Sequence, residues 1–169
     1  LSEDALAELL GSVGLTDDTT PVLYDRPQGQ NAAMLAWVLQ YLGRTDVHVM
    51  DSFYDEWVAQ GYAIFYRPVA TAPGKFTALP DSSVRVQLEV IAKEPSIKLV
   101  DFRTKDEFLG REDNIERPGH IPSAKHLDWQ NLVGEEGHIL ASEEKIRKLF
   151  EDVNIGRDDQ IVAYCRTGP

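Results

Sequence analysis

The chain has 169 residues, 43% of them hydrophobic, which is enough to build one sizeable domain or two small ones. Its formal net charge of −11 at pH 7 argues against nucleic acids and anionic membrane surfaces as partners, because these bind basic patches. No stretch approaches about 18 uninterrupted apolar residues, so we expect no transmembrane helix.

The sequence contains a single cysteine, which excludes an internal disulfide bond. No Cys/His cluster has the spacing of zinc ligands, and we expect neither a metal nor another cofactor. The first residues, LSEDALAELL, lack the basic start of a signal peptide. A reducing compartment is consistent with these features, and we expect a cytoplasmic location.

Helical and extended patterns alternate along residues 1–66. A helix is predicted from its N-cap, Ser2, to Val13, and a polar turn and the strand PVLY follow. The next helix, NAAMLAWVLQYLG, stops at Gly43; DVHVM is a short strand, and YDEWVAQGY is a helix that ends at Gly61. Residues 67–83, RPVATAPGKFTALPDSS, are interpreted as a linker because they contain three Pro and one Gly.

A repeat relates the beginning of the chain to its end. An offset of 140 positions aligns SEDALAELLGSVGLTDDTTPVLYDR from Ser2 with SEEKIRKLFEDVNIGRDDQIVAYCR from Ser142. Both copies predict a helix capped by serine, a polar turn, a buried strand and a loop. In this alignment Asp25 of the first copy matches Cys165 of the second.

The segments around the two copies define the predicted organisation. Residues 1–66 are the rear half of one unit, 67–83 are the linker, and 84–169 are the front part of a second unit. Either the chain is a piece of a longer two-unit protein, or the two partial units fold together as a permuted single unit. In both cases the alternating elements predict an α/β fold with a mainly parallel sheet.

The terminal loop, YCRTGP, is the candidate site of chemistry. A strand that delivers Cys165 into such a loop exposes it at the carboxyl edge of the sheet, where α/β proteins bind ligands. The charge of Arg166 stabilises a neighbouring thiolate. Thr167 offers a hydroxyl donor, and Gly168 permits the positive φ that an anion-binding loop needs. The alternative is that Cys165 is a small buried hydrophobic residue.

Several motifs together resemble the tandem-domain rhodanese family of sulfurtransferases. LVDFRTKDEFLG resembles the family's opening strand and helix, PGHIPSAKHLDW its Gly-His-Ile-Pro-Gly-Ala signature, and VAYCRTG its active-site loop. VLYD and the segment AAMLAWVLQYLGRTDVHVMDSFYDEWVAQG resemble the closing half of the inactive N-terminal domain, where an Asp often replaces the Cys. The resemblance implies a rhodanese-like fold with helices on both faces of the sheet, in which Asp25 is inert and Cys165 is catalytic.

The resemblance further implies a thiosulfate sulfurtransferase. The thiolate of Cys165 would take the sulfane sulfur of thiosulfate as a cysteine persulfide and then pass it to cyanide or a thiol. Arg166, Thr167 and Gly168 would bind the donor. The charge of Arg166 favours thiosulfate, because family members that use 3-mercaptopyruvate tend to have small uncharged residues at that place.

The sequence departs from the family's pattern at two places. Many members have a substrate-binding arginine where this chain has Glu107, which leaves Arg103 and Arg117 as candidates to bind substrate. Arg103 also suits a structural ion pair with Asp101. The family's loop continues into a helix, so we expect a polypeptide that ends at Pro169 to be inactive or nearly so.

Three alternatives are kept. The donor of a sulfurtransferase could be 3-mercaptopyruvate. A cysteine phosphatase or arsenate reductase would need Cys, five residues and then Arg, which is a position beyond the last residue of the sequence. A non-catalytic binding module is the third, and selective alkylation of Cys165 would distinguish it from an enzyme.

Overall fold

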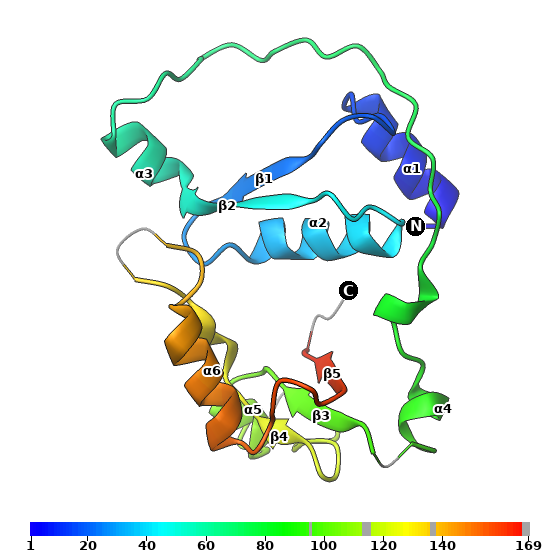
Figure 1. Cartoon of the computed structure of the whole chain (residues 1–169), viewed down its shortest axis with the longest axis vertical. Coiled ribbons are helices and arrows are strands. Elements are labelled where there is room, and N and C mark those ends of the chain that lie inside the picture. Colours follow the sequence, from blue (N-terminus) through cyan, green and yellow to red (C-terminus); the bar gives the residue numbers. More distant parts are fainter. Residues whose placement is uncertain (95, 113–115, 136–137, 167–169) are drawn as a thin grey trace. The chain divides into compact units, whose positions relative to one another are not determined.

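The computed structural model describes residues 1–94, 96–112, 116–135 and 138–166. The chain divides into two compact units, Leu1–Arg85 and Val86–Gly168. Figure 1 shows the helices and strands of each unit in chain order. Among the described residues, no helix combines the length and the apolar composition that crossing a membrane requires.

The first unit alternates helices and strands: α1 (Glu3–Ser12), β1 (Val22–Asp25), α2 (Gln30–Tyr41), β2 (His48–Phe53), α3 (Tyr54–Ala59) and the 3-10 helix η1 (Ser82–Val84). β1 and β2 form a two-stranded parallel sheet, and α2 is the crossover that a parallel pair requires (Figure 1). Leu39, Leu42 and Phe76 form the buried core of this unit.

The second half of the predicted linker packs against the first unit. Phe76 is only 6% exposed and belongs to the core of that unit. The carboxylate of Asp17 accepts hydrogen bonds from the backbone N–H and the hydroxyl of Thr77, at 2.7 and 2.9 Å. The backbone N–H of Leu79 donates to the carbonyl of Leu42. Residues 76–79 therefore help to stabilise the first unit.

The second unit contains α4 (Leu88–Ile91), β3 (Lys98–Asp101), α5 (Lys105–Phe108), β4 (Lys125–His126), the 3-10 helix η2 (Trp129–Leu132), α6 (Glu143–Asp152) and β5 (Ile161–Tyr164). Its three strands pair in parallel in the order β4-β3-β5. The central strand β3 is the most buried, and Val100 joins Leu127 and Ile155 in the core. The predicted α/β fold with parallel pairing is confirmed.

The elements of the predicted repeat lie at matching positions in the two units. α1 and α6 have ten residues each, and their bounds differ by 140 positions at both ends. Each helix begins after a serine whose hydroxyl accepts a hydrogen bond at 3.3 Å, Ser2 from the N–H of Ala5 and Ser142 from the N–H of Lys145. These bonds satisfy N–H groups that a helix leaves unpaired in its first turn.

The expectation that both repeated strands are buried is wrong. Val22 and Tyr24 of β1 are 61% and 62% exposed, and Ile161 of β5 is 39% exposed. Within the described part of the chain, β1 pairs with β2 alone and β5 with β3 alone, so both are edge strands. An apolar strand is buried only where another layer covers it, and the sequence pattern does not report that cover.

Candidate functional site

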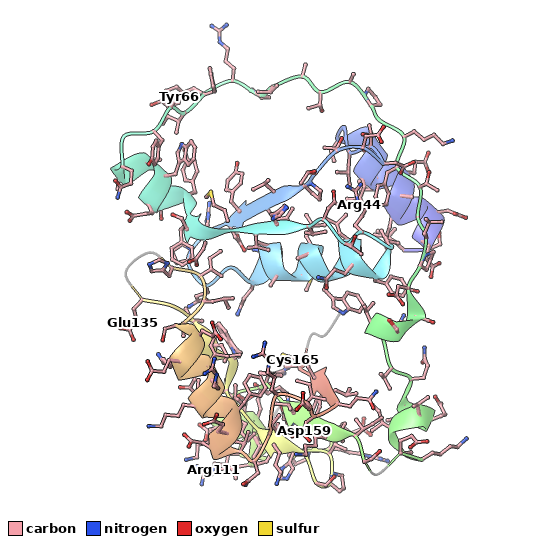
Figure 2. All side chains as sticks on the ribbon, viewed as in Figure 1. Arg44, Tyr66, Arg111, Glu135, Asp159 and Cys165 are labelled. Atoms are coloured by element: carbon pink, nitrogen blue, oxygen red, sulfur yellow. The ribbon has the colours of Figure 1, made fainter. Side chains whose placement is uncertain are left out.

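The carboxyl ends of the three strands of the second unit bring the candidate residues together. Asp101, the last residue of β3, is in register with His126 of β4 and with Tyr164 of β5. The chain visits β4 on one side of β3 and then β5 on the other side, which makes the end of β3 a topological switch point. Cys165 follows directly on β5, as Figure 2 shows.

A buried ion pair lies beneath this edge of the sheet. Asp101 is fully buried, and its carboxylate accepts hydrogen bonds from Nη2 and Nε of Arg103 at 2.6 and 2.9 Å. Burial alone would raise the pKa of the Asp101 carboxyl, but the hydrogen bonds from Arg103, with a smaller contribution from Tyr164, outweigh it and hold the pKa below its ordinary value. Nη2 of Arg103 also donates to the carbonyl oxygen of Gly119 at 2.8 Å, which ties the ion pair to the loop before β4.

Tyr164 connects the same loop to the strand that carries the cysteine. Its hydroxyl accepts a hydrogen bond from the backbone N–H of Ile121 at 3.2 Å. Burial is the main cause that raises the pKa of Tyr164 to about 12, so the hydroxyl keeps its proton at neutral pH. The guanidinium of Arg103 lies 5.7 Å from the centre of the ring.

Residues 116–122 form one wall of an open cavity of about 760 Å³. His120 in this wall stacks on Phe108 at 3.6 Å between ring centres, and its Nδ1 donates to the carbonyl of Phe108 at 2.8 Å. This ring position organises the loop. The cavity is lined by Arg103, Glu116, Arg117, Pro118, Gly119, His120, Ile121, Pro122, Tyr164, Cys165 and Arg166.

Cys165 is exposed at this cavity, so the alternative of a buried structural cysteine is wrong. The neighbouring Arg166 is about half exposed, and its Nη1 lies 3.2 Å from Oε2 of Glu112 and 3.5 Å from Oε1 of Glu107. The arginine that was expected to face an anion therefore has two carboxylates beside it. Arg117 also lines the cavity, and no carboxylate lies within ion-pair distance of it among the described residues.

Four predicted site residues thus line one cavity: Cys165, Arg166, Arg103 and Arg117. Thr167 and Gly168 lie outside the described residues, and their roles stay predictions. Sequence reasoning missed Tyr164, which accepts from the loop, and Glu112, which pairs with Arg166. The repeat places Tyr164 opposite Tyr24, but that match alone did not indicate a function.

In the first unit, Asp25 stands at the position that aligns with Cys165. Its carboxylate accepts hydrogen bonds from the backbone N–H groups of its own loop and of the following helix. Its Oδ1 accepts from the N–H of Arg26 at 2.8 Å, and its Oδ2 accepts from the N–H groups of Asn31 and Ala32 at 2.8 and 3.2 Å. The last two groups belong to the first turn of α2. Burial raises the pKa of the Asp25 carboxyl, but these hydrogen bonds outweigh it and lower the pKa overall.

In the described part of the chain, no group of three or more His, Cys, Asp or Glu is placed to hold a metal ion.

Comparison with protein families matches residues 85–169 to the rhodanese-like domain. The sulfur carrier protein TtuD of Thermus thermophilus is 32% identical over 98% of this chain and 63% of its own length. A Haloferax volcanii protein named "Putative thiosulfate sulfurtransferase" is 30% identical over 99% of this chain and 62% of its own length. The chain thus spans less than two thirds of the length of these relatives.

Two solved structures share the fold. The 3-mercaptopyruvate sulfotransferase SseA from Escherichia coli aligns with a TM-score of 0.84 at 19% identity, over 96% of this chain and 62% of its own. A persulfide form of EanB with ergothioneine aligns with a TM-score of 0.85 at 22% identity, over 98% of this chain and 46% of its own. At these identities the likeness concerns the fold.

Proposed function

Because the chain belongs to the rhodanese-like family, we propose that it is a sulfurtransferase that moves the sulfane sulfur of thiosulfate to cyanide or a thiol through a persulfide on Cys165. The observation that carries this proposal is the position of the thiol. Cys165 follows β5 at the carboxyl edge of a parallel sheet, is exposed, and lines a cavity that also holds Arg117 and Arg166.

The reaction proceeds in two displacements. The thiolate of Cys165 attacks the outer sulfur of thiosulfate, the S–S bond breaks, and sulfite leaves with the electron pair of that bond. Cyanide then attacks the outer sulfur of the persulfide, thiocyanate departs, and the thiolate is restored. The enzyme alternates between a free and a sulfur-loaded form, so we expect ping-pong kinetics.

The three arginines at the cavity have different proposed roles. Arg117 is the cation best placed to attract the oxyanion of the donor, because no described carboxylate pairs with it. For Arg166 to join it, a donor must compete with the carboxylates of Glu107 and Glu112. Arg103 lines the cavity, but its guanidinium is engaged by Asp101 and Gly119, so we propose that it positions the loop. Thr167 and Gly168 complete the proposed donor site.

A second candidate donor is 3-mercaptopyruvate, which carries a single carboxylate. The two carboxylates beside Arg166 favour a donor of lower charge than thiosulfate, and this observation supports the candidate. In either case we propose a reducing compartment, the cytoplasm, as the location, because the chemistry needs a reduced thiol.

Intact mass measurement after incubation with thiosulfate tests the proposal. We expect a gain of one sulfur atom, reversed by cyanide with release of thiocyanate. The variant Cys165→Ser should gain no sulfur. A protein that stays at its original mass with thiosulfate and with 3-mercaptopyruvate would contradict sulfur transfer, and would leave a binding module as the better reading.

A further inference from the structure

The carboxylates around Arg166 come from one short segment, α5 and the residues after it. Glu107 lies in the first turn of α5 and is largely buried, and its Oε2 accepts hydrogen bonds from the N–H and the hydroxyl of Thr104, both at 3.0 Å. Its other oxygen, Oε1, faces Arg166 at 3.5 Å. The capping box thus holds one oxygen of Glu107 while the other lies beside the arginine.

Glu112 is held less firmly. Its Oε2 lies 3.2 Å from Nη1 of Arg166, and its side chain is 32% exposed. An exposed ion pair of this kind is weak, because water and salt screen both charges. Glu112 can thus give up Arg166 to a competing anion, whereas Glu107 stays in place.

The balance of charge at the cavity makes this competition matter. Three arginines are among the residues that line the cavity, Arg103, Arg117 and Arg166. Asp101 pairs with Arg103. Glu107 and Glu112 pair with Arg166, and Glu116 is itself a lining residue of the cavity. Four described carboxylates therefore face three cations. A donor with two negative charges meets a site that does not have a positive surplus.

We propose that Glu112 is a specificity-determining residue that competes with the oxyanion of the donor for Arg166. It disfavours dianionic donors such as thiosulfate relative to sulfane-sulfur donors that carry one charge or none. The role of Glu112 in the choice of donor rests on the proposed function. The electrostatic effect of Glu112 on the thiol can be measured without any sulfur transfer.

Alkylation of Cys165 by two reagents of different charge measures that effect. The sequence has no other cysteine, so iodoacetate and iodoacetamide both report on this thiol alone. In Glu112→Gln we expect the rate with anionic iodoacetate, divided by the rate with neutral iodoacetamide, to rise about two- to fivefold at low salt. The rise should disappear at about 1 M salt, where charges a few ångströms apart are screened.

The matched control is Glu143→Gln. Glu143 forms an exposed ion pair with Arg147 at 2.6 Å on α6, in the same unit but outside the lining of the cavity. It should leave the ratio of the two rates unchanged. A ratio that does not change in Glu112→Gln, or that changes equally in both variants, overturns the inference.

Steady-state kinetics extend the test to specificity. In Glu112→Gln we expect KM for thiosulfate to fall about two- to fivefold, and KM for the singly charged donor benzenethiosulfonate to fall less. The two proposals fail in different ways. Absence of sulfur transfer with a changed alkylation ratio refutes the proposed function alone, whereas sulfur transfer with an unchanged ratio and an unchanged KM refutes the role of Glu112.

Discussion

Asp101 and Tyr164 are register partners at the carboxyl ends of β3 and β5, and the side chain of each shifts the pKa of the other. The same two residues reach the loop of residues 116–122 by separate routes. Tyr164 accepts from the N–H of Ile121, and Asp101 holds Arg103, which donates to Gly119. The wall of the cavity is thereby attached to the strand that carries Cys165, so a change in either contact should alter both stability and chemistry.

Tyr164→Phe should weaken this attachment. The substitution removes the hydroxyl that accepts from the N–H of Ile121 and leaves that N–H without this partner. We expect the free energy of unfolding to fall by about 1–3 kcal/mol, measured by urea denaturation. Tyr24→Phe is the control, because Tyr24 is the aligned residue of the first unit and is 62% exposed. Equal losses in the two variants would contradict the role of Tyr164.

Arg103→Lys should show that the shape of the guanidinium matters and not its charge alone. Arg103 contacts both oxygens of Asp101 and the carbonyl of Gly119, whereas an ammonium group cannot span these acceptors. We expect a loss of about 2 kcal/mol in the free energy of unfolding, together with slower loading of sulfur on Cys165. Arg147→Lys, in an exposed ion pair, should change neither quantity.

The sequence predicted the features that depend on local pattern. Serine caps and apolar spacing located α1 and α6, and the strand before a Gly-bearing loop located Cys165. The features it could not predict depend on residues far apart in the chain. Arg166 meets Glu112 across 54 positions, and Phe76 packs into the core from a segment that has the composition of a linker. No periodicity or spacing encodes such contacts, because they arise only once the strands have paired.

Arg117→Gln tests the assignment of the donor-binding cation. Arg117 is a lining residue of the cavity and has no described carboxylate partner, so we expect its charge to be available to a bound oxyanion. We expect KM for thiosulfate to rise about five- to tenfold, since hydrogen bonds to charged groups contribute about 1.5–3 kcal/mol and an exposed site realises only part of that. Arg157→Gln, an exposed residue of the same unit outside this cavity, is the control. An unchanged KM in Arg117→Gln would remove Arg117 from the donor site.

Asp25→Asn tests whether the carboxylate of the first unit stabilises its loop as an internal anion. The pKa of Asp25 is lowered in the folded protein, so its stabilisation is complete above the unfolded value of about 4 and is lost as the pH falls through the lower folded value. An amide can accept through one oxygen only, and its NH₂ group would face backbone donors such as those of Asn31 and Ala32. We therefore expect Asp25→Asn to be about 1 kcal/mol less stable at pH 7 and to lose less stability than the unchanged protein between pH 5 and about pH 2.

Thermal unfolding followed over that range measures both effects, with Asp158→Asn as the control at an exposed position. If the stability of Asp25→Asn and that of the unchanged protein fall in parallel as the pH decreases, the negative charge of Asp25 does not stabilise the loop of the first unit.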